Sequence, residues 1–121
     1  MNVIVAGGRD FSDWKMLYQV MDAQRSLARL DKEKIVVLSS TERGAAKLGE
    51  SWAKKRKLKI KKYLADWDKY GKSAGYRRNA EMVKDADYSI VFWDGKAKYI
   101  GRLIDLLEDR EVGLTMIMYN Q

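Results

Sequence analysis

Val3-Ile4-Val5-Ala6-Gly7-Gly8, near the start of the 121-residue chain, is an apolar run that ends in two glycines. A continuous run of β-branched residues is typical of a strand buried on both faces, and a glycine pair directly after it indicates a tight turn. Further apolar runs bounded by turn signals recur along the chain, with helical patterns between them. This alternation predicts an α/β fold with a parallel sheet.

Working outward from this run, we predict five strands, at residues 2–6, 34–39, 59–64, 88–92 and 114–118. The residues between them predict four helices, at 13–30, 45–57, 77–84 and 99–110, the first capped by Ser12. Right-handed crossovers then favour a Rossmann-like, doubly wound three-layer sandwich with a mainly parallel five-stranded sheet in the order 3-2-1-4-5. No linker, repeat or low-complexity tract interrupts the pattern, so we expect residues 1–121 to form one domain.

The composition excludes several kinds of chemistry. The chain has no His and no Cys, so disulfides, Cys/His zinc sites and Ser-His-Asp or Cys-His catalytic groups cannot form. No metal site and no cofactor are predicted. No apolar run is long enough to cross a membrane, and the N-terminus lacks the basic segment of a signal peptide. We therefore expect a cytoplasmic protein without a membrane partner.

The positive charge is concentrated in the middle of the chain. Of the 24 Lys and Arg residues, 14 lie between Arg43 and Lys84, where only 4 acidic residues occur. Two interpretations of the densest part stay open. It is either a patch that binds nucleic acid or the basic end of a helix followed by an edge strand that lysines protect from aggregation. The residues concerned are Lys54, Lys55, Arg56, Lys57, Lys59, Lys61 and Lys62.

Polar and glycine-containing loops follow the predicted strands. In a doubly wound sheet, ligands bind beyond the carboxyl ends of the strands, here between the first and fourth. Glycine turns, helix N-termini and arginines at this edge favour an anionic ligand. Trp67 and Tyr70 are candidates for stacking on a base. The predicted ligand-binding residues are Gly7, Gly8, Arg9, Asp10, Arg43, Gly44, Arg78, Asn79, Trp93, Asp94 and Gly95.

Some of these residues also have purely structural interpretations. Asp10 is a candidate cap of the first helix, and Trp93 is a candidate core residue. Arg78 has two candidate ion-pair partners, Glu81 and Asp94.

At these residues the chain resembles the YspA/YpsA-type branch of the SLOG superfamily. The similarity is carried by blocks that occur in the family's order over most of the chain: 3–11, 43–45 with 48–53, 65–67 with 70–75, 78–82 and 92–95. The resemblance implies a Rossmann-like domain that binds a nucleotide or a nucleotide-derived ligand. The wider superfamily includes phosphoribohydrolases and a protein that binds single-stranded DNA.

The chain departs from the family pattern in two loops. Where the family usually has Ser-Gly-Gly-Ala-Arg-Gly-Ala-Asp, residues 39–46 read Ser-Ser-Thr-Glu-Arg-Gly-Ala-Ala. Glu42 in this loop is expected either to repel a phosphate or to stabilise the next helix at its N-terminus. After the block at 92–95, the family's Ser-Arg-Gly-Thr is replaced by Ala97-Lys98-Tyr99-Ile100, which cannot form the same backbone nest for an anion.

The resemblance also bears on catalysis. The position of the phosphoribohydrolases' catalytic glutamate falls on Leu103, which has no group to polarise a ribose hydroxyl. We therefore expect no hydrolase activity. The leading hypothesis is a non-catalytic domain that binds a nucleotide-derived small molecule. The alternatives are a protein-interaction module, such as a phage-encoded inhibitor of a host protein, and a nucleic-acid binder. Dimerisation of the chain with itself is also compatible with the sequence.

Overall fold

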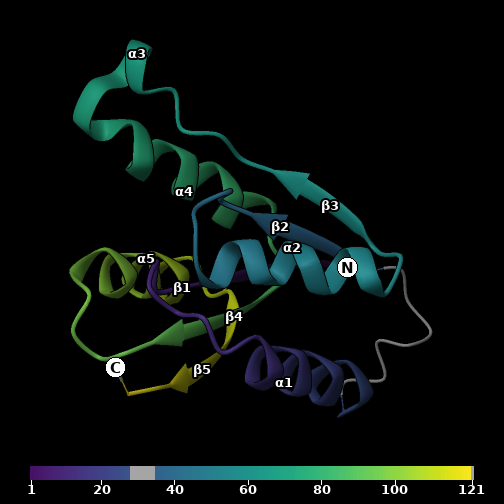
Figure 1. The fold of residues 1–121 in the computed structure, drawn as a ribbon. Coiled ribbons are helices and arrows are strands. Elements are labelled where there is room, and N and C mark those ends of the chain that lie inside the picture. Colours follow the sequence, from purple (N-terminus) through teal and green to yellow (C-terminus); the bar gives the residue numbers. More distant parts are fainter. Residues whose placement is uncertain (28–34, 121) are drawn as a thin grey trace.

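The structure, a computed structural model, describes residues 1–27 and 35–120 (Figure 1). All five strands are parallel and lie in the order β3-β2-β1-β4-β5, which confirms the predicted Rossmann-like α/β class and strand order. The strands are β1 (Asn2–Gly7), β2 (Val36–Ser39), β3 (Lys59–Lys62), β4 (Tyr88–Trp93) and β5 (Gly113–Met118). The helices are α1 (Trp14–Leu27), α2 (Ala45–Lys55), α3 (Trp67–Tyr70), α4 (Ala74–Asp85) and α5 (Lys98–Asp109), with a 3₁₀ turn η2 (Gly71–Ser73). The predicted end of the first helix at residue 30 and the predicted start of the second strand at residue 34 lie outside the described residues.

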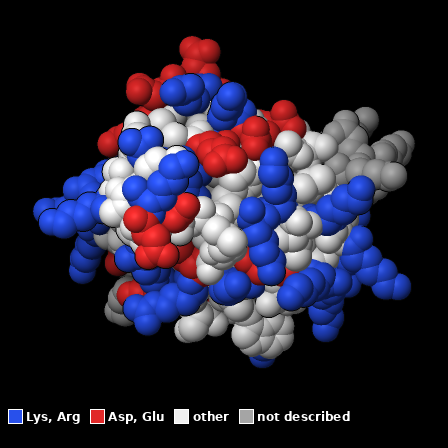
Figure 2. Space-filling view, turned by 90° about the horizontal axis from the view of Figure 1, so that it is seen from above, with Lys and Arg blue, Asp and Glu red and all other residues white. Residues whose placement is uncertain are grey.

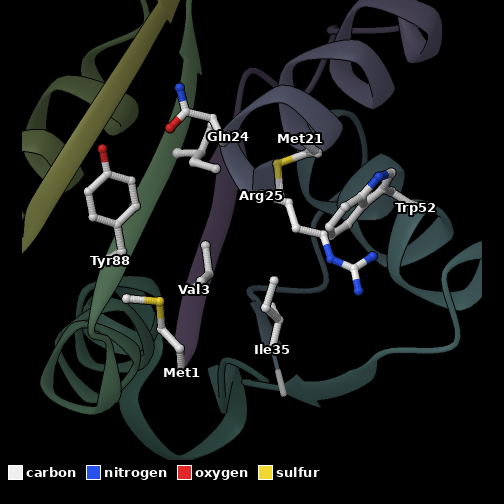
Figure 3. A pocket seen from close by; sticks show the side chains of 9 residues that line it. Met1, Val3, Met21, Gln24, Arg25, Ile35, Trp52 and Tyr88 are labelled. Carbon is white, nitrogen blue, oxygen red and sulfur yellow. The ribbon is translucent and has the colours of Figure 1, made fainter. Parts of the chain in front are cut away.

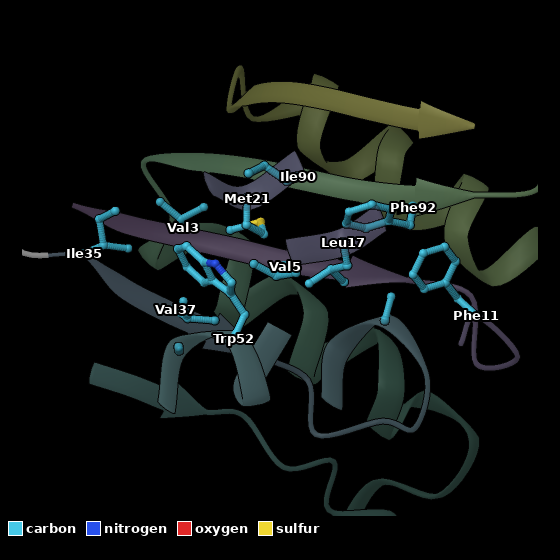
Figure 4. Packing of buried hydrophobic residues seen from close by; sticks show 12 residues of the cluster. Val3, Val5, Phe11, Leu17, Met21, Ile35, Val37, Trp52, Ile90 and Phe92 are labelled. Carbon is cyan, nitrogen blue, oxygen red and sulfur yellow. The ribbon is translucent and has the colours of Figure 1, made fainter. Parts of the chain in front are cut away.

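The central strand β1 is buried on both faces of the sheet. Successive side chains of a strand point to opposite faces, so Val3 and Val5 join one core and Ile4 and Ala6 join the other. The first core lies under α1 and α2 (Figure 4), and the second lies under α4 and α5. The continuous apolar run therefore produces three layers.

Trp52 of α2 lies fully buried in the first core. Its indole N–H donates a 2.9 Å hydrogen bond to Asp22 of α1, whose carboxylate also forms an ion pair with Arg56 at 2.6 Å. The hydrogen bond from Arg56 holds the pKa of Asp22 below its usual range. One residue of the basic stretch thus connects α2 to α1.

The strand β3 is an edge strand, as one interpretation of the basic stretch predicted. It pairs only with β2, and its Lys59 and Lys61 are exposed while Ile60 packs against the first core. Lys61 forms an ion pair with Asp85 at 3.1 Å, and the Tyr63 hydroxyl donates to the same carboxylate at 2.6 Å. The lysines therefore cover the edge and join it to α4.

Two local predictions are wrong. The segment 65–76, which lies between a predicted strand and a predicted helix and was assigned to neither, contains α3 and η2, and α4 begins at Ala74 rather than at residue 77. Asp66 accepts the N–H of Lys69 and so starts α3, which stands away from the sheet in Figure 1. At α1, the cap is Asp13 and not Ser12, because the Asp13 carboxylate accepts the N–H of Met16 at 3.1 Å.

Within residues 1–27 and 35–120, no helix is both long and apolar enough to cross a membrane.

Candidate functional site

Five segments line one cleft of about 220 Å³ at the carboxyl ends of the strands. They are the turns after β1 and β2, the segment of α3 and η2, and the helices α4 and α5. Parallel strands end at a common edge, so this arrangement makes neighbours of residues far apart in the sequence. The lining residues are Arg9, Glu42, Trp67, Lys72, Gly75, Tyr76, Arg78, Asn79, Tyr99, Arg102, Leu103 and Leu106.

Gly7 and Gly8 shape the turn after β1 without lining the cleft. A Cβ atom on Gly7 would lie 2.3 Å from the carbonyl oxygen of Phe92, and one on Gly8 would lie 1.8 Å from the hydroxyl oxygen of Tyr119. The carbonyl of Gly8 accepts the N–H of Ala45, the first residue of α2, at 3.2 Å. The two glycines thus let the turn pack directly against β4 and α2, which fixes the position of the next residue.

Glu42 lies between two arginines of the cleft. Its Oε2 is 2.7 Å from Nη2 of Arg9, and its Oε1 is 3.3 Å from Nη2 of Arg78. Nε of Arg9 donates a second hydrogen bond to Oε2 at 2.8 Å. One carboxylate therefore joins the turn after β1, the turn after β2 and the helix α4.

Arg78 is buried, with 8% of the residue exposed. Its guanidinium donates to the carbonyl of Ser40 at 3.3 Å and to Oδ1 of Asn79 at 3.0 Å, in addition to the contact with Glu42. Burial lowers the pKa of Arg78, and the charge of Glu42 opposes that shift. The interpretation that this arginine pairs with Glu81 or Asp94 is wrong.

Tyr99 contacts both the side chain and the backbone of Arg9. The guanidinium carbon of Arg9 lies 4.1 Å from the centre of the Tyr99 ring, which is cation–π geometry. The Tyr99 hydroxyl also accepts the backbone N–H of Arg9 at 2.7 Å. These contacts and the ion pair with Glu42 hold the Arg9 side chain at the mouth of the cleft.

Lys72 and Arg102 differ from the two arginines bound to Glu42. Both line the cleft, and in the described part of the chain neither forms an ion pair with a carboxylate. The aromatic residues beside them are largely exposed, Trp67 to 58% and Tyr76 to 65%. The cleft thus presents free positive charge and open ring faces together.

A family model described as the YspA, cpYpsA-related SLOG family matches residues 1–70, more than half of the chain. The chain belongs to this family. It is also similar to the Gene 61 protein of Mycobacterium phage D29, at 29% identity over 123 residues that cover 97% of this chain and 94% of that protein. No solved structure matches the chain.

The altered loop of this SLOG domain keeps the backbone shape of a glycine loop. Thr41 stands where the family resemblance places a glycine, and its φ is 66°. A β-branched residue in this left-handed conformation is strained, whereas glycine is not. Ser39, at the end of β2, donates to the buried carboxylate of Glu50 at 2.6 Å and accepts the N–H of Thr41. Glu42 does not cap α2, which has Gly44 at its N-cap and no side-chain hydrogen bond there.

Tyr99 stands at a further position where the SLOG pattern has glycine. In place of the glycine of the family's anion nest, this chain has an aromatic ring that contacts Arg9. The loss of the nest was predicted, but the new contact was not, because it joins residues 90 positions apart.

The structure places the other predicted ligand residues as follows. Arg9, Arg78 and Asn79 line the cleft together with Trp67. Asp10 instead accepts the Tyr119 hydroxyl at 3.2 Å, and it does not cap α1. Arg43 is exposed outside the cleft. A ligand role for these residues stays a prediction.

Gly44 and the Trp93-Asp94-Gly95 block have structural contacts. A Cβ on Gly44, at φ 82°, would lie 2.2 Å from the Gly8 carbonyl oxygen. Trp93 packs partly buried against the second core and donates to the Ala97 carbonyl at 3.0 Å. Asp94 accepts two backbone N–H groups ahead of α5, which hold its pKa below the usual range. This block borders the start of α5 rather than the cleft.

The basic stretch lies away from the cleft. Arg56, Lys61 and Lys62 form ion pairs with Asp22, Asp85 and Glu50. The four remaining cations, Lys54, Lys55, Lys57 and Lys59, are exposed. Seen from the side of α3, Lys and Arg spread over the surface with Asp and Glu among them (Figure 2). Nucleic-acid binding by this stretch stays a prediction; affinity for an oligonucleotide that falls steeply with rising salt would support it.

Tyr70 was predicted to stack on a base, and Leu103 stands at the catalytic position of the related hydrolases. Tyr70 lies outside the cleft, with the guanidinium of Arg77 4.4 Å from its ring centre. Leu103 is buried in the cleft wall.

Among the residues that line the cleft, Glu42 is the one carboxylate, and both of its oxygens contact arginines. The described residues contain no group of carboxylates that could hold a metal ion.

A second, mainly apolar pocket of about 160 Å³ lies between α1 and the sheet, at the amino ends of the strands (Figure 3). Met1, Met21, Ile35, Trp52 and Tyr88 are among its lining residues. It lies at the opposite end of the sheet from the SLOG domain's glycine turn.

Proposed function

We propose that the cleft binds a nucleotide or nucleotide-derived ligand and that the chain acts as a single SLOG-like binding domain. The observation that carries this proposal is the meeting of four cationic and three aromatic side chains around one cleft at the carboxyl edge of the sheet. Polar groups that converge in a concave site at this edge are typical of ligand sites in doubly wound folds.

The ligand's phosphate binds Lys72 and Arg102. Glu42 already contacts Arg9 and Arg78 and offsets one of their two positive charges, whereas Lys72 and Arg102 form no ion pair in the described part of the chain and are the cations most available to the phosphate. An arginine holds phosphate oxygens with two parallel N–H donors, and a lysine adds a point charge.

The ligand's base packs against Trp67 or Tyr76. Both side chains are more than half exposed although they are aromatic, and both line the cleft. Stacking of a base on such a ring contributes about 1–3 kcal/mol and does not depend strongly on which base it is. The ligand class is therefore better defined by its aromatic ring and its charge than by one particular base.

The ligand is bound and released without a chemical reaction. The catalytic position of the related phosphoribohydrolases is Leu103 here, whose side chain has no proton to transfer and no charge. Glu42, which is engaged by two arginines, is poorly suited to act as a general base.

Calorimetric titration with AMP tests this function. Arg102→Gln removes one phosphate-binding cation and is expected to weaken binding by about tenfold or more, because charge-assisted hydrogen bonds contribute about 1.5–3 kcal/mol. Arg110→Gln is the matched control, since Arg110 is exposed just beyond the end of α5 and outside the cleft. Equal losses in the two variants would contradict the site. Failure of every nucleotide and every cyclic or linear dinucleotide to bind would contradict the function.

A protein-interaction module is the second candidate. Leu64 is exposed to 77%, and it lies in the chain just before α3, which carries the exposed Trp67. Exposed apolar side chains that gather on one projection are typical of protein-binding surfaces. The similarity to a phage protein agrees with a phage-encoded inhibitor that binds a host protein.

Comparison of two tryptophan variants tests this second candidate. Trp67→Ala should abolish saturable retention of a host protein, while Trp14→Ala, which changes a tryptophan 51% exposed on α1, should not. Loss of host-protein retention in both variants would argue against a specific protein-binding surface at Trp67. Retention that is prevented by a nucleotide bound in the cleft would argue against a protein-binding surface separate from the cleft.

A further inference from the structure

The arginine pair of the cleft, Arg9 and Arg78, already holds an anion that belongs to the chain itself. Both oxygens of Glu42 are used, one for each arginine, at 2.7 and 3.3 Å. Two guanidinium groups that approach from different segments are also the arrangement that binds a phosphate group. Glu42 therefore occupies the place that a ligand's phosphate would take.

This ion pair can be reached from solvent. The side chain of Glu42 is 23% exposed and that of Arg9 is 45% exposed, whereas the side chain of Arg78 is only 7% exposed. Arg78 is thus the buried cation that needs an anion, and Glu42 is the partner that a ligand could replace.

The loop that carries Glu42 is held in an unusual shape. Thr41, directly before it, has a φ of 66°, and Gly44, two residues after it, has a φ of 82°. Gly44 adopts a positive φ without strain, but the β-branched Thr41 keeps this conformation only where surrounding contacts maintain it. The ion pairs of Glu42 are among those contacts.

We propose that Glu42 is a built-in anion that determines how much negative charge the cleft accepts. With Glu42 in place, Lys72 and Arg102 are the two cleft cations that have no carboxylate partner among the described residues, so the wild-type cleft takes one phosphate group and gains little from a second. Without the carboxylate, the arginine pair becomes available to a second phosphate. This inference rests on the proposed nucleotide-binding function and names the charge of its ligand.

Titration of AMP and ADP into variants of Glu42 tests the proposal. In the wild type, ADP should bind no more than about threefold more tightly than AMP, whereas in Glu42→Gln and Glu42→Ala it should bind at least about tenfold more tightly. Glu81→Gln is the matched control, because Glu81 is exposed on α4 and lines no part of the cleft. It removes the same charge from the chain and should behave like the wild type.

A double variant locates the effect. Arg9→Gln combined with Glu42→Gln should lose the preference for ADP, because one arm of the arginine pair is gone. Circular dichroism checks that each variant is folded. If Glu42→Ala does not fold, the affinities measured with Glu42→Gln alone test the proposal.

The outcomes distinguish a failure of the proposed role of Glu42 from a failure of nucleotide binding by the cleft. If both nucleotides bind but Glu42→Gln leaves their affinity ratio unchanged, or if Glu81→Gln changes it equally, the role of Glu42 is wrong and the cleft remains a nucleotide site. If neither nucleotide binds the wild type but ADP binds Glu42→Gln, Glu42 is the built-in anion and the wild-type function is wrong. If neither nucleotide binds any protein, both are wrong.

Discussion

Gly7→Ala is expected to lower the free energy of unfolding by about 3 kcal/mol or more, from backbone strain of about 1–3 kcal/mol and overpacking of similar size. The added Cβ would lie 2.3 Å from the carbonyl oxygen of Phe92 and 2.9 Å from Cβ of Ala45. Both neighbours belong to the framework of the sheet and α2, so neither can move without disturbing the turn that positions Arg9. Urea denaturation followed by circular dichroism measures the loss.

Gly71→Ala is the matched control for this variant. Gly71 has a φ of 56°, and a Cβ there would meet no atom within 4 Å. Gly71→Ala therefore isolates the backbone cost of an alanine at a positive φ, about 1–3 kcal/mol, without any clash of the added Cβ. A Gly7→Ala protein as stable as Gly71→Ala would show that close packing around β1 is not what requires glycine.

Trp52→Ala is expected to destabilise the protein by about 3–5 kcal/mol, the usual cost of removing a buried aromatic side chain. Trp52 is fully buried between α2 and the sheet, and its indole N–H also satisfies Asp22 of α1. Removal of the ring leaves a cavity beside the first core and breaks one link between the two helices. Thermal and urea unfolding measure the change.

Two further variants make this prediction specific. Trp14→Ala removes a half-exposed tryptophan whose ring contacts Tyr18, and it should cost about 1 kcal/mol. Trp52→Phe keeps most of the buried area but loses the donor to Asp22, so it should fall between the two. Equal stability of Trp52→Ala and Trp14→Ala would contradict the core described above.

The positions of the strands could be predicted from the sequence because buried strands are encoded locally, and their order followed from right-handed crossovers in a doubly wound fold. The runs at Val3-Ile4-Val5 and Ile90-Val91-Phe92 are apolar at every position, as a parallel strand with helices on both faces requires. Strand boundaries shifted by only one or two residues where the structure describes them. The edge strand β3 was recognisable because Leu58 and Ile60 alternate with lysines.

The α3–η2 segment was missed because its helices are single turns with no apolar face. Trp67 and Tyr70 are exposed, and the stabilising contact of α3 is the local bond from the Lys69 N–H to Asp66. Asp is a preferred residue at the N-cap of a helix, so Asp66 could have indicated that a helical turn begins at Trp67.

The contacts of the cleft could be predicted only in part. Arginines and aromatic residues at the loop edge follow from the topology, but the partner of each does not. Glu42 reaches arginines 33 and 36 positions away, and Arg102 and Leu106 enter the cleft only because α5 packs beside α4. Such long-range pairings depend on how helices pack on the sheet, and neither composition nor local spacing encodes them.

A crystal structure of the wild-type protein with AMP tests the central claim most directly. The phosphate should lie within hydrogen-bond distance of Lys72 or Arg102, the base should pack on Trp67 or Tyr76, and Glu42 should still bridge Arg9 and Arg78. A nucleotide bound instead in the apolar pocket of Figure 3 or on the basic stretch, or an empty cleft at saturating AMP, would contradict it.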